Sequence, residues 1–315
     1  MIQLPLFPTP SSVVIIKRTE ILEAWTWLLR SMSPRPNRYD GLCVYDLKLW
    51  SDESSKDQPL SPTTWVIKVL SRLYLTSELG VLDDILNMVN GENTQDVVVP
   101  IGSLDEDVKK VVKSKARFRN ALSEHLAFWI RLATAAKSRA ASRFACSLPN
   151  VQPEDKGPDG LFLSAGAITK VEVQSVKNSI SDPQAQVSTK TFRTSGRIPP
   201  KSKGKLLEDF YKFAYSHFGF TRLERDLVDL CRLLNIQADR KLRIALLSNT
   251  ECSYNAVVVA NYQYAEVELF KGYQYVTPDV QHRIATYIGS SDWPELAEQT
   301  RKSVEEILRR LRLLP

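Results

Sequence analysis

Two acidic residues and a glutamine have the types and spacing needed to bind a divalent cation. Asp159 lies in the turn sequence GPDG, and Glu172 and Gln174 follow on a predicted strand at 170–176. Side chains alternate along a strand, so Glu172 and Gln174 point to one face. A buried carboxylate is costly unless it is paired or bound to a metal. Carboxylates brought together at the mouth of a hairpin repel each other, and Mg²⁺, which takes oxygen ligands, relieves that repulsion.

A third acid, Glu124, lies in a segment that favours a buried helix. Residues 104 to about 145 are almost free of Gly and Pro, which predicts one long helix or two in tandem. Two apolar stripes run beside Glu124 at helical spacing, one of Leu122, Leu126, Trp129 and Ala133 and one of Ala121, Phe128 and Ala135. A helix that is apolar on most sides is buried, so Glu124 is expected in the interior. An ion pair with Arg131 or another nearby arginine is the structural alternative.

The other two acids also have ordinary structural explanations. Asp159 is a natural turn residue in GPDG, whatever its chemistry. Glu172 is suited to an ion pair with Lys170 or Lys177 on a half-buried strand. The isolated histidines, expected to be structural, are His125, His217 and His282.

The remaining pattern predicts a mixed succession of strands and helices. Strands are expected at 12–18, 40–50, 161–163 and 170–176, and in the stretches LRIALLSNT, YNAVVVANYQY and VELFKGYQYV. Helices are expected at 21–29, 63–79, 81–89, 205–218, 223–234, 279–288 and 293–314. The character of the chain changes near residue 100. We therefore divide it into a smaller N-terminal α+β region, 1–103, suited to recognition or docking, and an α/β domain, 104–315.

Length and composition are those of an ordinary globular protein. The 315 residues are 43% hydrophobic and 25% charged, which excludes wholesale disorder. No apolar run approaches the roughly 18 residues of a membrane span, and the first residues make a poor signal peptide. Four cysteines without a CxxC pair argue against a disulfide scaffold or zinc ribbon, and the histidine spacing excludes HExxH chemistry. We expect a protein of a reducing compartment, cytoplasmic or nuclear if eukaryotic, with no membrane partner.

The net charge of +6 is unevenly distributed along the chain. Residues 108–153 carry ten Lys or Arg and one acid, and residues 183–207 carry six and none, so the two segments hold +9 and +6 and the rest −9. Phosphate backbones are the commonest partner of such a pattern, because each neutralised phosphate releases counterions. A solvated basic face without a partner is the alternative. The predicted nucleic-acid-binding residues are Lys113, Lys115, Arg117, Arg119, Lys190, Arg193, Arg197, Lys201 and Lys203.

The acids and their spacing resemble the motif of a nuclease family. Pro158-Asp159, followed across a predicted hairpin by Glu172-x-Gln174, is similar to the pattern of the PD-(D/E)XK nuclease superfamily, which includes many restriction enzymes. The family pattern also has a glutamate on a helix before the aspartate, and Glu124 is similarly placed. The resemblance covers residues 104–260 and implies a restriction-endonuclease-like core, a mixed sheet flanked by helices.

The resemblance also implies a reaction, the hydrolysis of phosphodiester bonds in nucleic acid, DNA favoured over RNA, by a Mg²⁺- or Mn²⁺-dependent endonuclease. Restriction or phage defence would be its setting. The metal ligands that it implies are Asp159, Glu172, the backbone carbonyl of Val173, and Glu124. Gln174 would position the attacking water, directly or through the metal.

The third motif position departs from the family pattern, because Gln174 stands where a lysine is usual. Lys177 lies on the opposite strand face and fits only if a bulge intervenes, and Lys190 is a second candidate from the basic segment. This departure favours the alternative function, a non-catalytic nucleic-acid-binding or scaffolding subunit with a degenerate nuclease fold. Other enzyme classes lack support, since no P-loop, GxGxxG or GxSxG is present. A homodimer or a partner subunit is left open.

Overall fold

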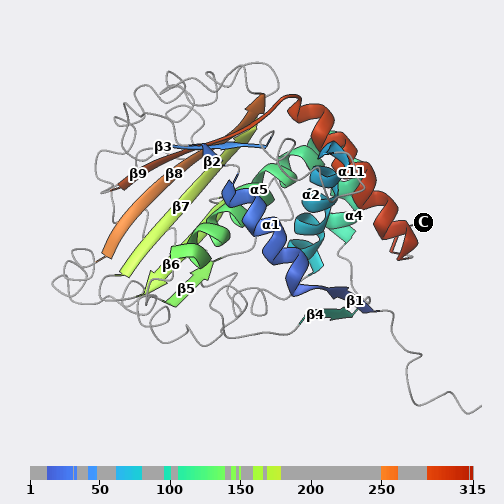
Figure 1. Cartoon of the computed structure of the whole chain (residues 1–315), viewed down its shortest axis with the longest axis horizontal. Helices are drawn as coiled ribbons and strands as arrows, with labels where there is room; N and C mark the ends of the chain where they lie inside the picture. The colour runs from blue at the N-terminus through green and yellow to red at the C-terminus, as the bar shows by residue number, and fades with distance from the viewer. Residues whose placement is uncertain are drawn as a thin grey trace, which may run out of the picture.

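The computed structural model contains both helices and strands. It describes residues 13–30, 32–33, 42–47, 62–79, 96–100, 106–138, 143–146, 149, 159–165, 169–178, 250–261, 282–311 and 313–314. The helices are α1 (Arg18–Arg30), α2 (Pro62–Leu79), α4 (Glu106–Lys113), α5 (Lys115–Ser138) and α11 (Trp293–Arg310). The strands are β1 (Val13–Ile16), β2 (Met32–Ser33), β3 (Leu42–Asp46), β4 (Val97–Pro100), β5 (Arg143–Cys146), β6 (Gly160–Ala165), β7 (Thr169–Asn178), β8 (Thr250–Asn261) and β9 (His282–Ser290). The fold is mixed α/β, which confirms the predicted class (Figure 1).

Most of the described strands form one mixed sheet, in the order β2-β3-β9-β8-β7-β6-β5. β5, β6 and β7 pair antiparallel with their neighbours in the chain. β7, β8, β9 and β3 run parallel, and β2 pairs antiparallel with β3 at the edge. Antiparallel neighbours can be joined by a turn, whereas parallel neighbours need a crossover. The β6–β7 hairpin therefore places Asp159, which directly precedes β6, against the strand that carries Glu172 and Gln174.

The middle of the sheet is apolar on both of its faces. In β8 the residues from Ala256 to Ala260 are at most 1% exposed, and successive side chains on a strand point to opposite faces. In β9 the run from Thr286 to Ser290 is likewise buried. The helix predicted at 279–288 was wrong for this reason, because a strand buried on both faces lacks the alternation that distinguishes it from a buried helix.

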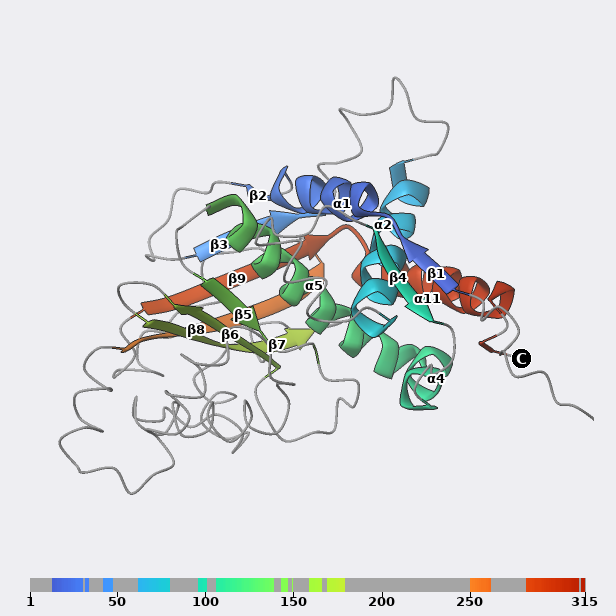
Figure 2. The same cartoon turned by 90° about the horizontal axis from the view of Figure 1, so that it is seen from below.

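Helix α5 lies over β6 and β7 on one face of the sheet, with α1, α2 and α11 packed around it (Figures 1 and 2). Trp27 of α1, Trp129 of α5 and Trp293 of α11 are fully buried in one core cluster, together with sheet residues such as Val257 and Ile288. The alternate positions of β7 and β8 that face this cluster include Glu172, Gln174 and Asn255. Glu172 and Gln174 therefore lie on the face of the sheet that the helices cover.

The two regions predicted from the sequence meet in this architecture. β3 pairs in parallel with β9, and α1 and α2 supply core residues that pack with α5 and α11. The described parts of 1–103 and 104–315 thus share one sheet and one core. No helix in the described ranges is long and apolar enough to cross a membrane.

The segment predicted as helix from residue 104 to about 145 contains two helices in tandem and a strand. α4 and α5 are separated by Ser114, whose carbonyl accepts a hydrogen bond from the N–H of Phe118 (2.9 Å). The helix prediction was wrong at its end, where Arg143–Cys146 forms β5. Pairing with β6 supplies backbone hydrogen bonds there and overrides the local helix propensity.

Most of the other predicted elements that fall on described residues are confirmed. β1, β3, β6, β7 and β8 match predicted strands, and α1, α2 and α11 match predicted helices. The predicted elements outside the described residues are those at 81–89, 205–218 and 223–234, most of LRIALLSNT, and VELFKGYQYV.

Trp129 offers a test of the contact between α5 and α2. Its indole Nε1 donates to the carbonyl of Leu73 (2.9 Å) and to Oγ of Ser77 (2.7 Å). Trp129→Phe removes this buried donor, and we expect the free energy of unfolding to fall by about 1–3 kcal/mol more than in Trp293→Phe. Trp293 is the matched control, because it is equally buried and its Nε1 has no hydrogen-bond partner within the described residues. Urea unfolding measures both, and equal losses would contradict the prediction.

Candidate functional site

Asp159 is tied to the end of β7 by two hydrogen bonds. Its N–H donates to the carbonyl of Gln174 (3.1 Å), and its Oδ2 accepts from the N–H of Val176 (2.6 Å). Gly160 permits this close approach, since a Cβ at that position would lie 3.0 Å from Oε1 of Gln174. Asp159 can therefore be both a turn residue and a member of the candidate site, because the turn positions its carboxylate at the end of β7.

Glu172 is the centre of a buried set of polar side chains on the helix-facing side of the sheet. Its Oε2 accepts from Nε of Arg131 on α5 (2.6 Å). Its Oε1 accepts from Nε2 of Gln174 and from Nδ2 of Asn255, both at 3.1 Å. The hydroxyl of Thr286 donates to Oδ1 of Asn255 (2.9 Å), which turns the Asn255 amide nitrogen toward Glu172. We call these five residues the sheet-face network.

The ion pair in this network differs from the alternatives that the sequence offered. Glu172 is only 5% exposed, so it does not lie on a half-exposed strand, and its partner is Arg131. Arg131, which the sequence offered as a partner of Glu124, forms an ion pair with Glu172. Gln174 is 2% exposed and donates its amide to Glu172, so its first contact is with protein rather than with a solvent water.

A second group, which we call the strand-end cluster, consists of Glu124, Asp159 and Lys177. Nζ of Lys177 lies 3.9 Å from Oδ2 of Asp159. Oε2 of Glu124 is buried and has no hydrogen-bond partner within the described ranges. The pKa of Glu124 is raised to about 9, first by burial and then by the negative charge of Asp159, with Lys177 opposing the shift and Glu78 adding to it. Glu124 is therefore protonated at neutral pH.

Lys177 reaches Asp159 without a bulge in the β6–β7 ladder. The register pairs Gly160 with Gln174 and continues without interruption to Ser164 and Lys170. The expectation that Lys177 fits only across a bulge was wrong, because Asp159 lies beyond the end of β6, where a long side chain can reach it from the strand end. Lys177 thus lies beside the carboxylate of Asp159, whereas the side chain of Gln174 contacts Glu172.

A third buried polar contact, between His125 of α5 and Glu78 of α2, involves the residue that follows Glu124 in the sequence. Nε2 of His125 is 2.7 Å from Oε1 of Glu78, and both side chains are at most 3% exposed. The neighbouring Tyr74 has a pKa well above its ordinary value, first because it is buried and then because of the Glu78 charge. His125 is therefore a buried histidine whose Nε2 is hydrogen-bonded, whereas its Nδ1 has no partner within the described residues.

The four predicted catalytic residues are thus divided between two groups. Asp159 and Glu124 belong to the strand-end cluster, and Glu172 and Gln174 belong to the sheet-face network. Val173, whose carbonyl was a predicted ligand, pairs with Leu161 and Tyr254 inside the sheet. In the described ranges no three His, Cys, Asp or Glu residues are gathered as a metal site.

These contacts decide which acids suit a divalent cation. Mg²⁺ in proteins is commonly held by only one or two carboxylates and keeps several waters. Asp159 and Glu124 fit that requirement, since the charge of Asp159 raises the pKa of Glu124 and one Glu124 oxygen lacks a partner among the described residues. Glu172 fits it poorly, because three donors already occupy its two oxygens.

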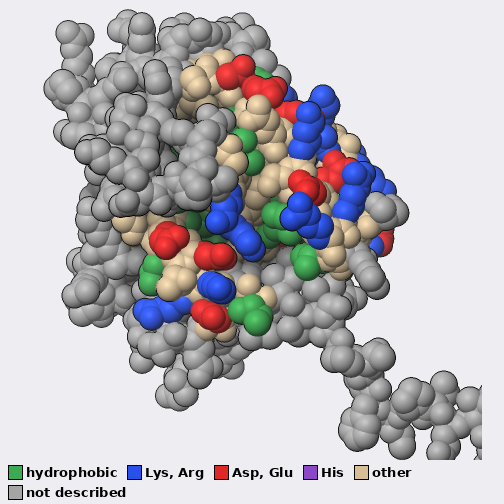
Figure 3. Space-filling model, turned by 45° about the vertical axis from the view of Figure 1, so that its right-hand side comes forward, with side chains coloured by type: hydrophobic (Ala, Val, Ile, Leu, Met, Phe, Trp, Pro, Cys, Tyr) green, Lys and Arg blue, Asp and Glu red, His purple; other side chains and the backbone are tan. Residues whose placement is uncertain are grey.

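The basic residues of the first segment are more fully paired than their sequence suggests. Lys109 and Lys110 bind Glu106 and Asp107 on α4, and Lys115 lies 3.5 Å from Glu298 of α11. Basic and acidic side chains are consequently interleaved on the face that carries α4 and α11 (Figure 3). The predicted residues of the second segment, Lys190, Arg193, Arg197, Lys201 and Lys203, lie outside the described residues.

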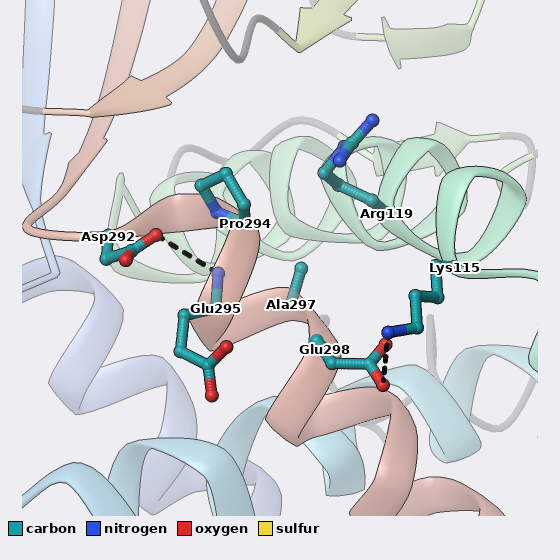
Figure 4. Close-up of a pocket in the computed structure, with 7 residues that line it drawn as sticks. All are labelled: Lys115, Arg119, Asp292, Pro294, Glu295, Ala297 and Glu298. Carbon is teal, nitrogen blue, oxygen red and sulfur yellow. Dashed lines mark hydrogen bonds and ion pairs between the residues drawn. The ribbon is translucent and has the colours of Figure 1, made fainter.

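The described residues also form a hollow of about 290 Å³ between the first turns of α5 and α11. Its lining residues are Lys115, Arg119, Asp292, Pro294, Glu295, Ala297 and Glu298 (Figure 4). Nε of Arg119 donates to Oδ1 of Asn178 at the end of β7 (3.2 Å), and burial lowers the pKa of Arg119. Of the predicted nucleic-acid-binding residues, Lys113 and Arg117 are exposed, and Arg119 links the hollow to the strand that carries Glu172.

The geometry defines the class of protein, a mixed α/β protein with buried carboxylates between a helix and the end of a β-hairpin. Comparisons with protein-family models, with curated proteins and with solved structures find no match in any of the three.

Three residues of the sheet-face network, Arg131, Asn255 and Thr286, escaped prediction as site residues. Arg131 follows Glu124 by seven residues, which places both on one helix face, but the choice of partner depends on how α5 crosses β7. Asn255 is the polar residue at the start of the apolar run AVVVA, and its alternation with Val257 indicates the helix-facing side of β8.

The protonated state of Glu124 predicts a specific pH dependence of stability. The unfolded chain releases this proton near pH 4.5, whereas the folded protein holds it up to a pKa of about 9. The free energy of unfolding therefore falls as the pH rises between these values. Between pH 5 and pH 8 we expect the parent to lose roughly 2–4 kcal/mol more than Glu124→Gln, measured by urea unfolding.

The matched control is Glu306→Gln, since the Glu306 side chain is 62% exposed. It should keep the pH dependence of the parent. A Glu124→Gln profile that is parallel to the parent profile would show that Glu124 titrates normally.

Proposed function

We propose that the protein is a Mg²⁺- or Mn²⁺-dependent endonuclease of the PD-(D/E)XK kind, which hydrolyses phosphodiester bonds in nucleic acid, DNA favoured over RNA. The observation that carries the proposal is Glu124, whose buried Oε2 has no partner among the described residues, beside Asp159 at the carboxyl end of β7. Strongly shifted carboxyl groups of this kind cluster at functional sites. The setting would be restriction or phage defence in the cytoplasm, or in the nucleus if the source is eukaryotic.

A restriction-endonuclease-like core is part of the proposal, and the order of the elements supports it. The helix with the acid, α5, precedes the antiparallel strands β5, β6 and β7, and β8 then pairs in parallel with β7. Asp159 immediately precedes β6, and Glu172 lies on β7 beneath α5. This is the placement of helix glutamate, aspartate and strand glutamate that the resemblance implies.

In this proposal Asp159 and Glu124 would hold the cation. A bound Mg²⁺ or Mn²⁺ would lower the pKa of a water and stabilise the negative charge that develops on the phosphate. Asp159 is oriented for this role by the N–H of Val176, and Lys177 places a positive charge beside it. Lys113, which is exposed, and the residues of the second basic segment would hold the nucleic-acid backbone.

The cleavage reaction tests the assignment of Asp159 and Glu124. With Mg²⁺ or Mn²⁺ and duplex DNA, single-stranded DNA or RNA, we expect the parent to cleave at least one substrate. Asp159→Asn and Glu124→Gln should each lower the rate by about 100-fold or more, because each removes a carboxylate ligand of the cation, that of Glu124 forming when the cation displaces its proton. Glu306→Gln should cleave like the parent. Cleavage that survives both site substitutions would refute the assignment.

Salt dependence tests the basic segments separately from the chemistry. Replacement of Lys190, Arg193 and Arg197 by Gln should flatten the plot of log affinity against log salt by about 0.9 for each phosphate of duplex DNA that the variant no longer neutralises. The matched control replaces Lys109 and Lys110 by Gln, since both are already paired with acids on α4. If the control flattens the slope and the first variant does not, the second segment is not the phosphate-binding surface.

One observation favours the alternative function, a non-catalytic nucleic-acid-binding or scaffolding subunit. The carboxylate of Glu172 is neutralised within the protein by Arg131, whereas the family pattern uses this position to bind metal. Nucleic-acid binding by the parent without cleavage of any substrate would establish this alternative. A partner subunit or a second copy would then be required for catalysis.

A further inference from the structure

Helix α5 is joined to β7 by polar contacts at two separated places. Near the start of α5, Arg119 and Asn120 bind the side chain of Asn178, at 3.2 and 2.5 Å. Further along, Arg131 binds Glu172 at 2.6 Å. Figure 1 shows α5 lying along this strand. Glu124 therefore lies on the stretch of helix between two attachment points.

The spacing along α5 couples Arg131 to Glu124. Seven residues are two turns of an α-helix, or about 10 Å, so the two side chains leave the same helix face. Because a helix is stiff over this distance, the position of Arg131 on the sheet determines where Glu124 lies relative to Asp159. The charge of Asp159 acts on Glu124 in this arrangement.

The contact between Arg131 and Glu172 is itself closely defined. Glu172 also accepts from Gln174 and Asn255, and Thr286 orients Asn255. The guanidinium carbon of Arg131 lies 5.5 Å from the centre of the Phe162 ring, within the range of a cation–π contact. A buried carboxylate that is paired with an arginine and accepts three hydrogen bonds is neutralised without a metal.

We infer that Arg131 is a positioning residue: with Glu172 it anchors α5 on β7 so that Glu124 is held beside Asp159, and Glu172 acts as this anchor rather than as a cation ligand. The inference rests on the proposed function, in which Asp159 and Glu124 hold the cation. It reassigns the strand glutamate of the motif from metal binding to the support of the helix acid.

The two possible roles of Glu172 predict opposite effects of removing Arg131. If Glu172 is the anchor, Arg131→Met releases α5 and weakens cation binding at Glu124 and Asp159. If Glu172 is a ligand, Arg131 competes with the cation, and Arg131→Met strengthens binding. The sign of the change in affinity therefore decides between them.

The test is a titration of the full-length protein with Mn²⁺, followed by the electron paramagnetic resonance signal of free Mn²⁺. We expect Arg131→Met and Glu172→Gln each to weaken Mn²⁺ binding by about 10-fold or more, the size of effect seen when a supporting residue of a metal site is removed. Arg131→Lys, which keeps the charge, should stay within about 3-fold of the parent. The double variant Arg131→Met/Glu172→Gln should bind no more weakly than either single variant, because both changes break one contact. Arg309→Met, an exposed arginine on α11, is the control and should bind like the parent.

Urea unfolding and near-ultraviolet circular dichroism of the same variants show whether each is folded, and Arg131→Lys carries the test if Arg131→Met is not. Tighter binding in Arg131→Met, or in Arg131→Lys if that variant alone is folded, overturns the inference. So does a double variant whose loss is the product of the two single losses. A parent that binds no Mn²⁺ overturns the proposed function together with the inference, whereas a parent that binds Mn²⁺ as tightly as Arg131→Met overturns the positioning role alone.

Discussion

A carboxylate on the covered face of a sheet must be neutralised, and the pairing of Glu172 with Arg131 meets that demand. The pair joins the longest described helix to the strand that carries the motif, and the other described helices pack around that helix. Removing either Arg131 or Glu172 would leave the charge of the other without its ion-pair partner and without the hydrogen bond between them. This contact and the one between Asn178 and the start of α5 fix the helix on both sides of Glu124.

The parts of the candidate site that could be predicted are those fixed by local geometry. Alternation along a strand correctly placed Glu172 and Gln174 on one face, and the apolar surroundings of Glu124 correctly indicated burial. The partners of these acids could not be predicted, because Arg131 and Asn255 reach Glu172 from other elements whose crossing angle and register are tertiary properties. Alternation along β7 did not indicate that the long side chain of Lys177 comes within 3.9 Å of Asp159 at the strand end. The fold was predictable to a similar extent, since the hairpin and the amphipathic helices were anticipated and the doubly covered strand β9 was not.

Charge counted along the chain and charge arranged in space give different descriptions of this protein. The first basic segment carries one acid within its own length, yet Glu106, Asp107 and Glu298 lie just outside it or far along the chain and return to pair with its lysines. Acidic residues are favoured in the first turn of a helix, and side chains three residues apart lie next to each other on its surface. The pairs that Lys109 and Lys110 form within α4 are therefore expected from helix geometry. Because acidic side chains lie among the basic ones, this surface should attract anions less strongly than the charge of +9 on residues 108–153 implies.

The parallel pairing of β3 with β9 has a consequence for how the protein is made. Leu42 is synthesised early, but its partner Ala285 follows roughly 240 residues later. At translation rates of about 5–20 residues per second, β3 waits some 10–50 seconds for its neighbour. During that interval an apolar segment with unpaired backbone groups is open to other chains, and loop-closure entropy opposes the final docking. Completion of the sheet is therefore expected to wait until β9 has been synthesised, and its yield to depend on chain concentration and on holdase chaperones.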